Sequence, residues 1–343
     1  MADHPSSPAK PGVPECALLS RRSFLHVCGA ATLAATLPTA TAGALGRLDR
    51  PVRIGMIADL HHDLMYDGES RLRAFLDSMQ RQPPDALMQL GDFACPSEPN
   101  QAVASAFSSA HRTALHVIGN HDLDNGHTKQ HCIDRWGMKG RFYAEDVGGL
   151  RVLGLDGNDR GSPTHRGGYP SFVGPEQVEW LGAQLAEHPG PFLIVSHQPL
   201  AGAWSVDNAA EIQALLAPFA DKVLLCVNGH SHIDQVLRAG RILHLHVNSA
   251  SYYWVGSAYK HTSLAAEVHE RFPWISHTCP YRDPLFTALT FEPGNGIIRL
   301  EGCRGEWVGP SPAELGVDSH PELVDGEQIA PRIRARRIAR WSA

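Results

Sequence analysis

The sequence predicts an α/β fold in which a two-sheet β-sandwich is flanked by helices. Past residue 50, five short runs are mostly aliphatic and lack polar alternation, which is typical of central strands buried on both faces. Stretches expected to be helical lie between these runs. The alternation of strand and helix favours largely parallel pairing, which places functional residues beyond the carboxyl ends of the strands.

The expected elements follow in order along the chain. The five strands are expected at residues 52–58, 86–90, 114–118, 192–196 and 223–228. The helices are expected at residues 69–80, 101–109, 175–187 and 208–219. Further strands at 241–247, 285–291 and 297–300, the last two joined by a Pro-Gly-Asn-Gly turn, would complete the second sheet.

Composition excludes several classes of protein. The chain of 343 residues is 43% hydrophobic and 19% charged, which argues against disorder and fibrous repeats. Its net charge of -6 offers no broad basic surface, so nucleic acid is not expected as a stable partner. The 20 histidines are two-thirds as many as the 30 Lys and Arg together, which is a reason to look for metal.

The first 44 residues have the pattern of an export signal. Arg21 and Arg22 precede a mild apolar run at 27–37, which small residues suited to signal-peptidase cleavage follow. The arginine pair indicates the twin-arginine type, so we expect that export machinery as a partner and a periplasmic or secreted location. No stretch reaches ~18 apolar residues, so no stable membrane anchor is expected. The predicted divisions are a signal peptide at 1–44, one large domain at 45–310 and a C-terminal tail at 311–343.

Metal-capable side chains follow each of the five predicted strands. In chain order they are Asp59 and His61; Asp92; Asn120, His121 and Asp122; His197; and His230 and His232. A lone Asp or His after a strand is usually an ordinary loop residue. Because the carboxyl ends of the strands meet at one edge, we expect the five segments to converge on one site. Glycines 91, 119 and 229 stand where the chain must turn sharply into that site.

The residue types indicate the metals. Carboxylate and amide oxygens mixed with imidazole nitrogens suit Zn, Mn or Fe. Seven candidate ligands are too many for one catalytic zinc ion but suffice for two ions with a bridging carboxylate. Such a pair can activate water and stabilise the attacking and leaving oxygens in phosphoryl transfer. The sequence contains no serine-nucleophile elbow, phosphate-binding loop or dinucleotide motif.

These blocks resemble the calcineurin-like metallophosphoesterase superfamily. The sequence has Asp59-x-His61, Gly91-Asp92, Gly119-Asn120-His121-Asp122, His197 and Gly229-His230-x-His232, in the family order. The resemblance implies a βαβαβ sandwich core and two divalent or trivalent metal ions. It implies that Asp59, His61, Asp92 and His232 hold one ion, and that Asp92, Asn120, His197 and His230 hold the other. His121 would protonate the leaving oxygen, and Asp122 would orient its ring.

The resemblance implies hydrolysis of a small phosphomonoester or phosphodiester, with a metal-bridging hydroxide as the nucleophile. A nucleotide pyrophosphatase or a cyclic-nucleotide phosphodiesterase would have the same core, and the motifs do not separate them. An alternative of another class is a non-catalytic protein that binds metal or phosphate. The intact His121 and the complete ligand set argue against that alternative.

Three further regions are candidates near the site. Cys95 stands where the family commonly has an acidic or amide residue, and we expect it to be a buried thiol rather than a ligand. The Gly-rich loop at 156–171 and the aromatic segment at 248–254 are candidates for substrate contacts. His244 and His246 share one face of an expected strand and could border the cleft.

Overall fold

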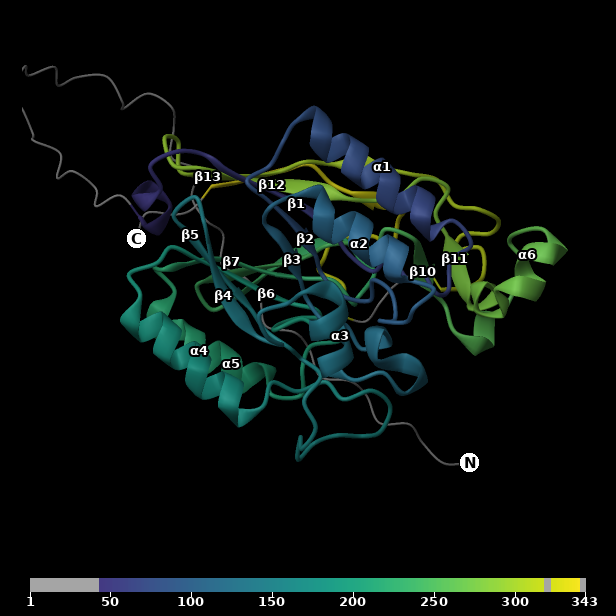
Figure 1. Cartoon of the computed structure of the whole chain (residues 1–343), viewed down its shortest axis with the longest axis horizontal. Coiled ribbons are helices and arrows are strands. Elements are labelled where there is room, and N and C mark those ends of the chain that lie inside the picture. Colours follow the sequence, from purple (N-terminus) through teal and green to yellow (C-terminus); the bar gives the residue numbers. More distant parts are fainter. Residues whose placement is uncertain (1–42, 318–321, 340–343) are drawn as a thin grey trace, which may run out of the picture. The chain divides into compact units, whose positions relative to one another are not determined.

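The computed structural model describes residues 43–317 and 322–339. The predicted signal peptide therefore lies outside the described residues, except for its last two positions. Among the described residues, no helix combines the length and the apolar character needed to cross a lipid bilayer. The described chain has two six-stranded sheets, with helices on their outer sides (Figure 1).

The first sheet is built around three parallel strands. Strands β1, β2 and β3 pair in parallel, and antiparallel strands extend the sheet on the other side of β1. The sheet order is β16-β13-β12-β1-β2-β3. The strands are β1 (Val52–Ile57), β2 (Ala86–Gln89), β3 (Ala114–His116), β12 (Thr287–Glu292), β13 (Ile297–Leu300) and β16 (Arg336–Ala339).

The second sheet has the order β4-β5-β6-β7-β9-β8. Its inner strands β5, β6, β7 and β9 are parallel, and both edge strands are antiparallel to their neighbours. The strands are β4 (Tyr143–Val147), β5 (Leu150–Gly154), β6 (Phe192–Ser196), β7 (Val223–Asn228), β8 (Gln235–Ala239) and β9 (Ile242–His246). Two small sheets pair β10 (Tyr252–Trp254) with β11 (Thr278–Pro280), and β14 (Cys303–Arg304) with β15 (Arg332–Ile333).

Helices cover the two sheets on opposite sides. Figure 1 shows α1 and α2 beside the first sheet and α4 and α5 beside the second. The α-helices are α1 (Gly68–Arg81), α2 (Gln101–Ala110), α3 (Lys129–Trp136), α4 (Pro175–Glu187), α5 (Ala209–Leu216) and α6 (Ala266–Arg271). The 3-10 helices are η1 (Ala44–Arg47), η2 (His121–Gly126), η3 (Ala217–Phe219), η4 (Ser257–Tyr259) and η5 (Pro273–His277). All four predicted helices are confirmed, with η3 continuing the last of them.

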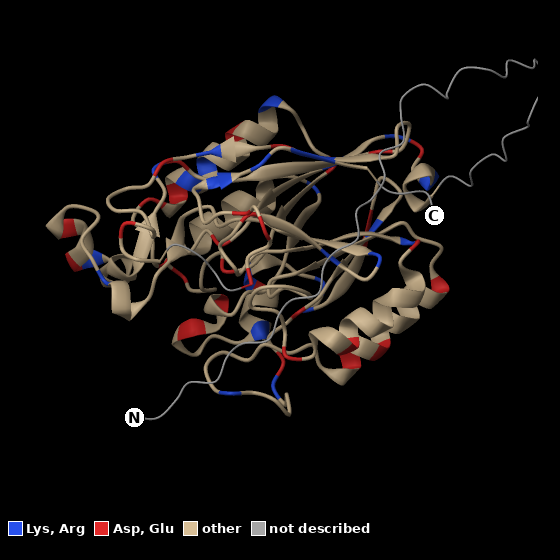
Figure 2. Cartoon of the chain, turned by 180° about the vertical axis from the view of Figure 1, so that it is seen from behind, with Lys and Arg blue, Asp and Glu red and all other residues tan. Residues whose placement is uncertain are grey.

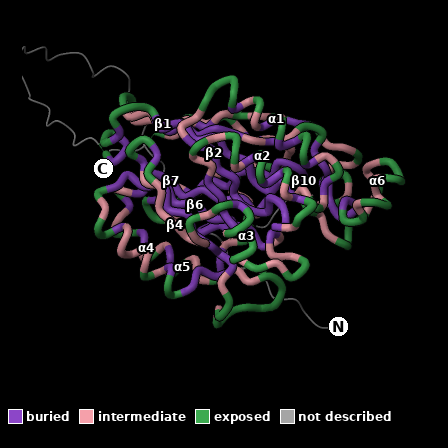
Figure 3. The backbone as a smooth tube through the Cα atoms, in the orientation of Figure 1, coloured by how far each residue is buried: buried purple, intermediate pink, exposed green. Residues whose placement is uncertain are grey.

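Burial explains why the strand prediction succeeded. Every residue of β1, β2, β6 and β7 is buried, as expected for strands covered on both faces. Their inward faces form one large apolar cluster between the sheets, and the outward faces pack under the helices. Figure 3 shows these strands as a buried centre surrounded by more exposed helices and loops.

The arrangement of the C-terminal strands differs from the prediction. They do not complete the second sheet together. Strand β9 pairs with β7 in the second sheet, whereas β12 pairs with β1, and β13 with β12, in the first sheet. The described part of the segment 311–343 also belongs to the fold, since β16 pairs with β13. Arg336 anchors this strand through an ion pair with the buried Asp234.

Candidate metal centre

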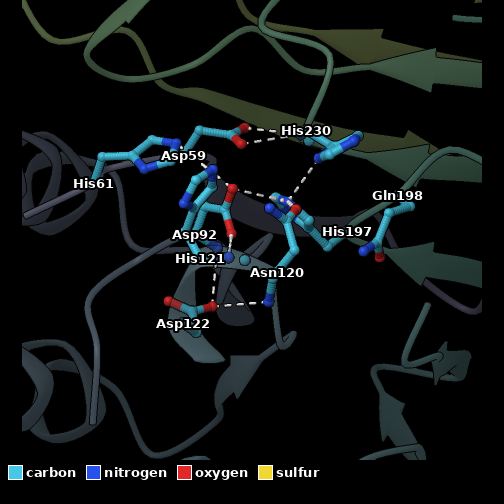
Figure 4. Close-up of polar contacts among 12 residues, drawn as sticks. Asp59, His61, Asp92, Asn120, His121, Asp122, His197, Gln198 and His230 are labelled. Atoms are coloured by element: carbon cyan, nitrogen blue, oxygen red, sulfur yellow. Dashed lines mark hydrogen bonds and ion pairs between the residues drawn. The ribbon is translucent and has the colours of Figure 1, made fainter. Parts of the chain in front are cut away.

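The five predicted segments meet at one place. Each follows the carboxyl end of a parallel strand: β1, β2 and β3 of the first sheet, and β6 and β7 of the second. Figure 4 shows side chains from all five segments pointing toward one another. The two sheets therefore supply one site between them, as expected for strand-end loops in an α/β fold.

The donor atoms fall into two groups. Asp59, His61 and His232 form one group, and Asp92, His197 and His230 form the other. Within each group the potential ligand atoms lie within 4.8 Å of one another. Asn120 joins the second group, because its Oδ1 lies 3.2 Å from Nε2 of His197.

Asp92 lies between the two groups. Its Oδ2 is 3.1 Å from Nε2 of His197 and 3.6 Å from Nε2 of His61. Its other oxygen, Oδ1, accepts a hydrogen bond from the backbone N–H of His121 at 2.8 Å. The carboxylate is almost completely buried, so its orientation is set by these neighbours.

Backbone carbonyls orient two of the imidazoles. Nδ1 of His197 donates to the carbonyl of Leu90, and Nδ1 of His232 donates to the carbonyl of Tyr252, each at 2.8 Å. Both rings therefore direct Nε2 into the site. Nε2 of His232 lies 3.3 Å from Nε2 of His61. Imidazoles held through one nitrogen, with the other converging on neighbouring ligands, are the arrangement that metal sites use.

The backbone at the site is strained. Positive φ angles occur at Asp59, His61, Asp92, His230 and His232, with values from 48° to 66°. Non-glycine residues rarely adopt this left-handed conformation, and it persists where the surrounding structure enforces it, often at functional sites. Among the other non-glycine residues that the structure describes, only Asn125 and Trp204 have a positive φ.

The three predicted glycines serve two purposes. Gly91 has a φ of 92°, which suits glycine, and a Cβ there would overlap the ring of His197. Gly119 and Gly229 are needed for space rather than for a positive φ. A Cβ at Gly119 would overlap Asp92, and one at Gly229 would lie 2.6 Å from Oδ2 of Asp59. The strand ends thus approach too closely for any side chain at these positions.

Burial and charge set the protonation of the imidazoles. Burial lowers the pKa of His61 and His230 well below its usual range, so both rings are neutral at pH 7. Burial also lowers the pKa of His197, but the carboxylate of Asp92 outweighs it and raises the pKa to about 9. Metal ligation requires deprotonated donors, so an ion would displace this proton. With that proton lost, the two groups of carboxylates and neutral imidazoles could hold two metal ions.

His121 stands beside the two groups and is not a member of either. Its Nδ1 lies 2.8 Å from Oδ2 of Asp124, and the side chain is 40% exposed. The prediction that Asp122 orients this ring is wrong. The Asp122 carboxylate instead accepts hydrogen bonds from the backbone N–H groups of Asp92, Gly119 and two further residues, Phe93 and Ala94. It ties the second and third strand-end loops together.

Two connected cavities open beside the donor groups. His61, Asp92 and His121 line both of them. The first has a volume of about 290 Å³ and is also lined by Trp204 and the aromatic segment of β10. The second has a volume of about 490 Å³ and extends past Cys95 and Asp124 to Trp274. Tyr169, from the Gly-rich loop, and Trp254 line both cavities.

Sequence reasoning missed several of these residues. Asp124 could have been found, because it lies one helical turn beyond His121 at the spacing of a local pair. Trp204 and Trp274 carry no local signal. Their contribution depends on how two loops fold back over the strand ends.

Three other residues that the sequence suggested near the site lie outside the two groups of donor atoms. The thiol of Cys95 is buried and donates to the carbonyl of His121 at 3.4 Å. His246 is buried behind Ser231, whose hydroxyl lies 2.9 Å from its Nδ1. His244 is also buried, and neither of its ring nitrogens has a hydrogen-bond partner among the described residues. The expectation that the two histidines border the cleft is wrong, because neither lines a cavity of the site.

The model of the calcineurin-like phosphoesterase family matches residues 52–234, which include every donor residue of both groups. The chain belongs to the calcineurin-like phosphoesterase family. The match spans more than half of the chain and ends at the segment after β7. No curated protein sequence matches the chain.

Several solved structures have the same fold as this chain, although their sequence identity to it is low. A dimetal phosphatase from Danio rerio is 14% identical with a TM-score of 0.52, and the match covers 77% of this chain and all of that one. GAP50 of Plasmodium, described as the anchor in the inner membrane complex, is 13% identical with a TM-score of 0.50. That match covers 83% of this chain and 90% of GAP50. At these identities the likeness shows the fold alone, so function must be argued from the side chains.

Proposed function

We propose that this protein hydrolyses phosphomonoesters or phosphodiesters with the help of two metal ions. The observation that carries the proposal is the position of Asp92 between two groups of donor atoms from five separate strand ends. Asp59, His61 and His232 would hold one ion; Asn120, His197 and His230 would hold the other; and Asp92 would bridge them. Bound there, two ions activate water and neutralise the phosphoryl oxygens.

His121 is proposed as the general acid. Burial lowers its pKa, but Asp92 and Asp124 together outweigh burial and raise it, which favours the protonated ring. The ring lines both cavities and therefore faces a bound ester. As water adds to phosphorus and the bond from phosphorus to the leaving oxygen breaks, His121 gives its proton to that oxygen. Asp124 holds the ring, and Asp122 holds the loops that carry it.

The test is metal-dependent turnover by the purified chain without residues 1–44. After chelation, the protein is reloaded with Mn, Zn or Fe and supplied with p-nitrophenyl phosphate, bis(p-nitrophenyl) phosphate and a panel of nucleotides. Turnover that returns with metal is the expected result. A protein that binds two ions but hydrolyses nothing would be the non-catalytic binding protein instead.

Export is the second part of the proposal. The support is the sequence pattern alone: Arg21 and Arg22 followed by a mild apolar run and small residues. A twin-arginine signal would carry the folded protein, with its metals bound, to the periplasm or beyond. The described chain begins at Gly43, inside the last two positions of the predicted signal peptide. Helix η1 starts at Ala44, and its residues Ala44 and Leu45 are buried in the main apolar cluster.

A further inference from the structure

Exposed aromatic side chains gather at the mouth of the site. The large hydrophobic side chains exposed in the described chain are few, and four of them line the two cavities: Tyr169 (47%), Trp204 (59%), Trp254 (42%) and Trp274 (59%). Clustered large aromatic groups at a surface mark binding sites more often than isolated ones do. The four come from four separate segments, namely the Gly-rich loop, the segment after β6, β10 and η5, so local composition does not explain their meeting.

Contacts with buried neighbours hold these rings in place. The indole of Trp254 stacks on the ring of His277, with the ring centres 5.6 Å apart and the planes 9° apart. The ring of Trp274 lies 5.0 Å from the same histidine, which is 9% exposed. Since His277 supports both indoles, they keep their position without a ligand. Trp204 has a φ of 59°, a left-handed backbone conformation that persists only where the surrounding structure enforces it.

Apart from His121, the proposed general acid, the described walls of the two cavities carry no positively charged side chain that could bind a further phosphate. Among the described residues, neither cavity is lined by Lys or Arg. The second cavity is lined instead by the carboxylates of Asp63 and Asp124. Asp63 accepts hydrogen bonds from the backbone N–H of Cys95 and from the side-chain amide of Asn100. These two bonds fix the position of the Asp63 carboxylate in the cavity wall. Sites for phosphate chains use Arg or Lys, and here an extra phosphoryl group would face like charge.

The charges of the whole chain agree with this. Figure 2 shows Lys and Arg interspersed with Asp and Glu along the described ribbon. Apart from His121, the attraction for a phosphoryl group would therefore come from the two ions. A substrate with one phosphoryl group needs nothing more.

We propose that the substrate is a phosphodiester with a single phosphoryl group, whose leaving group carries a flat aromatic ring and no further negative charge. The inference rests on the proposed function, with the phosphoryl group held at the two ions. The two cavities meet at His61, Asp92 and His121. The donors His230 and His232 also line the first cavity, so the ions and the phosphoryl group would fill its inner part, and the second substituent of a diester would lie at its outer wall beside Trp204. The leaving group occupies the second cavity. Asp124, which holds the proposed general acid His121, lines the second cavity and not the first. The ring stacks against Trp254 and Trp274.

Matched substrates test the aromatic subsite. Methyl phosphodiesters of naphthylethanol, cyclohexylethanol and ethanol all have one charge and a primary alkoxide leaving group, so their intrinsic reactivities are similar. We expect kcat/KM for the naphthylethyl ester to exceed that for the cyclohexylethyl ester by about tenfold, the scale of stacking on one aromatic side chain. Trp274→Leu keeps an apolar side chain but removes the ring, and should reduce this preference to about twofold or less.

A control variant and a diphosphate complete the design. Tyr66 is 44% exposed and lines neither cavity, so Tyr66→Ala should leave the preference and the activity unchanged. The diphosphate diester that joins the same naphthylethyl and methyl groups has a much better leaving group, so affinity rather than rate is compared: its KM should be at least about tenfold higher than that of the monophosphate diester. An equal or lower KM for the diphosphate, or an aromatic preference that survives in Trp274→Leu, would overturn the proposal.

Failure of the two proposals can be told apart. If methyl ethyl phosphate is hydrolysed with no aromatic preference, the inference fails and the proposed function stands. If no ester is hydrolysed with any metal, the proposed function fails. Binding then decides the subsite: the naphthylethyl ester of methylphosphonic acid, titrated by calorimetry into metal-loaded protein, should bind about tenfold more weakly to Trp274→Leu. Equal affinity for both proteins would refute the aromatic subsite.

Discussion

Nδ1 of His121 lies 2.8 Å from Oδ2 of Asp124, while the adjacent Asp122 turns its carboxylate to four backbone N–H groups. Two neighbouring carboxylates thus have separate tasks. One holds the ring proposed as the general acid, and the other fixes the loops that bring that ring to the donor groups. Tyr169 completes the arrangement, because its hydroxyl donates to Oδ1 of Asp124 at 2.7 Å.

We expect Asp124→Asn to lower kcat by about 10- to 100-fold, the usual effect of losing the partner that orients a reactive histidine. His121→Ala should cost about 100- to 10,000-fold, the contribution of a general acid. Both variants should retain two bound ions by elemental analysis, since neither residue belongs to a donor group. Asp134→Asn, at an exposed carboxylate on α3, is the control. Loss of metal from Asp124→Asn would contradict this assignment.

Gly119→Ala should abolish metal binding and activity. Its Cβ would overlap the backbone nitrogen and Oδ1 of Asp92, so the proposed bridging carboxylate would have to move. Gly294→Ala is the matched control, because a Cβ there meets nothing within 4 Å. Metal content and melting temperature of the two variants are the measurements. If Gly119→Ala binds two ions normally, the close approach of these loops is not required.

Metal should stabilise the folded protein. An ion that binds only the folded state adds about 2.7 kcal/mol at a concentration 100 times its Kd, so chelation should lower Tm and metal should restore it. Asp92→Asn should lose both the bound metal and the Tm increase, whereas Asp77→Asn, at an exposed position of α1, should behave as the parent. An Asp92→Asn protein that keeps two ions would refute the bridging role.

The start of the Gly-rich loop should be sensitive to acid. Burial raises the pKa of Asp159, but the ion pair with Lys129, 2.6 Å away, contributes to a net lowering. An acid whose pKa is lowered by folding adds stability above its unfolded pKa and loses that stability as the pH falls through the folded value. Lys129→Met should therefore be less stable than the parent at pH 7, with a difference that narrows toward pH 3 in chelator. Lys139→Met, at an exposed surface pair with Glu145, should show little difference at either pH.

Replacing Arg21 and Arg22 by lysines should leave the protein in the cytoplasm. The paired arginines are the feature that distinguishes a twin-arginine signal from other secretory signals. Cell fractionation followed by detection of the chain in each fraction is the measurement, with Arg47→Lys, outside the signal pattern, as the control. Unchanged export of the double variant would exclude the twin-arginine route.

The sequence by itself determined the central strands and the types of residue that follow them. The aliphatic composition of residues 192–196 predicts a strand that is buried on both faces. The predicted strand has the same bounds as β6. Strand direction places Asp92 at the carboxyl edge of the first sheet and His197 and His230 at that of the second, whatever the detail of the loops, and the packing of the two sheets joins these edges.

Only the tertiary structure decided the partners within the site. Whether Asp122 or Asp124 holds His121 depends on the path of η2, which local sequence does not specify. The aromatic walls bring together Tyr169 from the Gly-rich loop, Trp204 from the segment after β6 and Trp274 from η5. Loop positions are set by long-range packing rather than by local propensity, so their residues carry no periodic signal. The residues at the strand ends therefore predicted the metal-binding groups from the sequence. The aromatic residues that line the cavities and would select a substrate could be identified only from the folded structure.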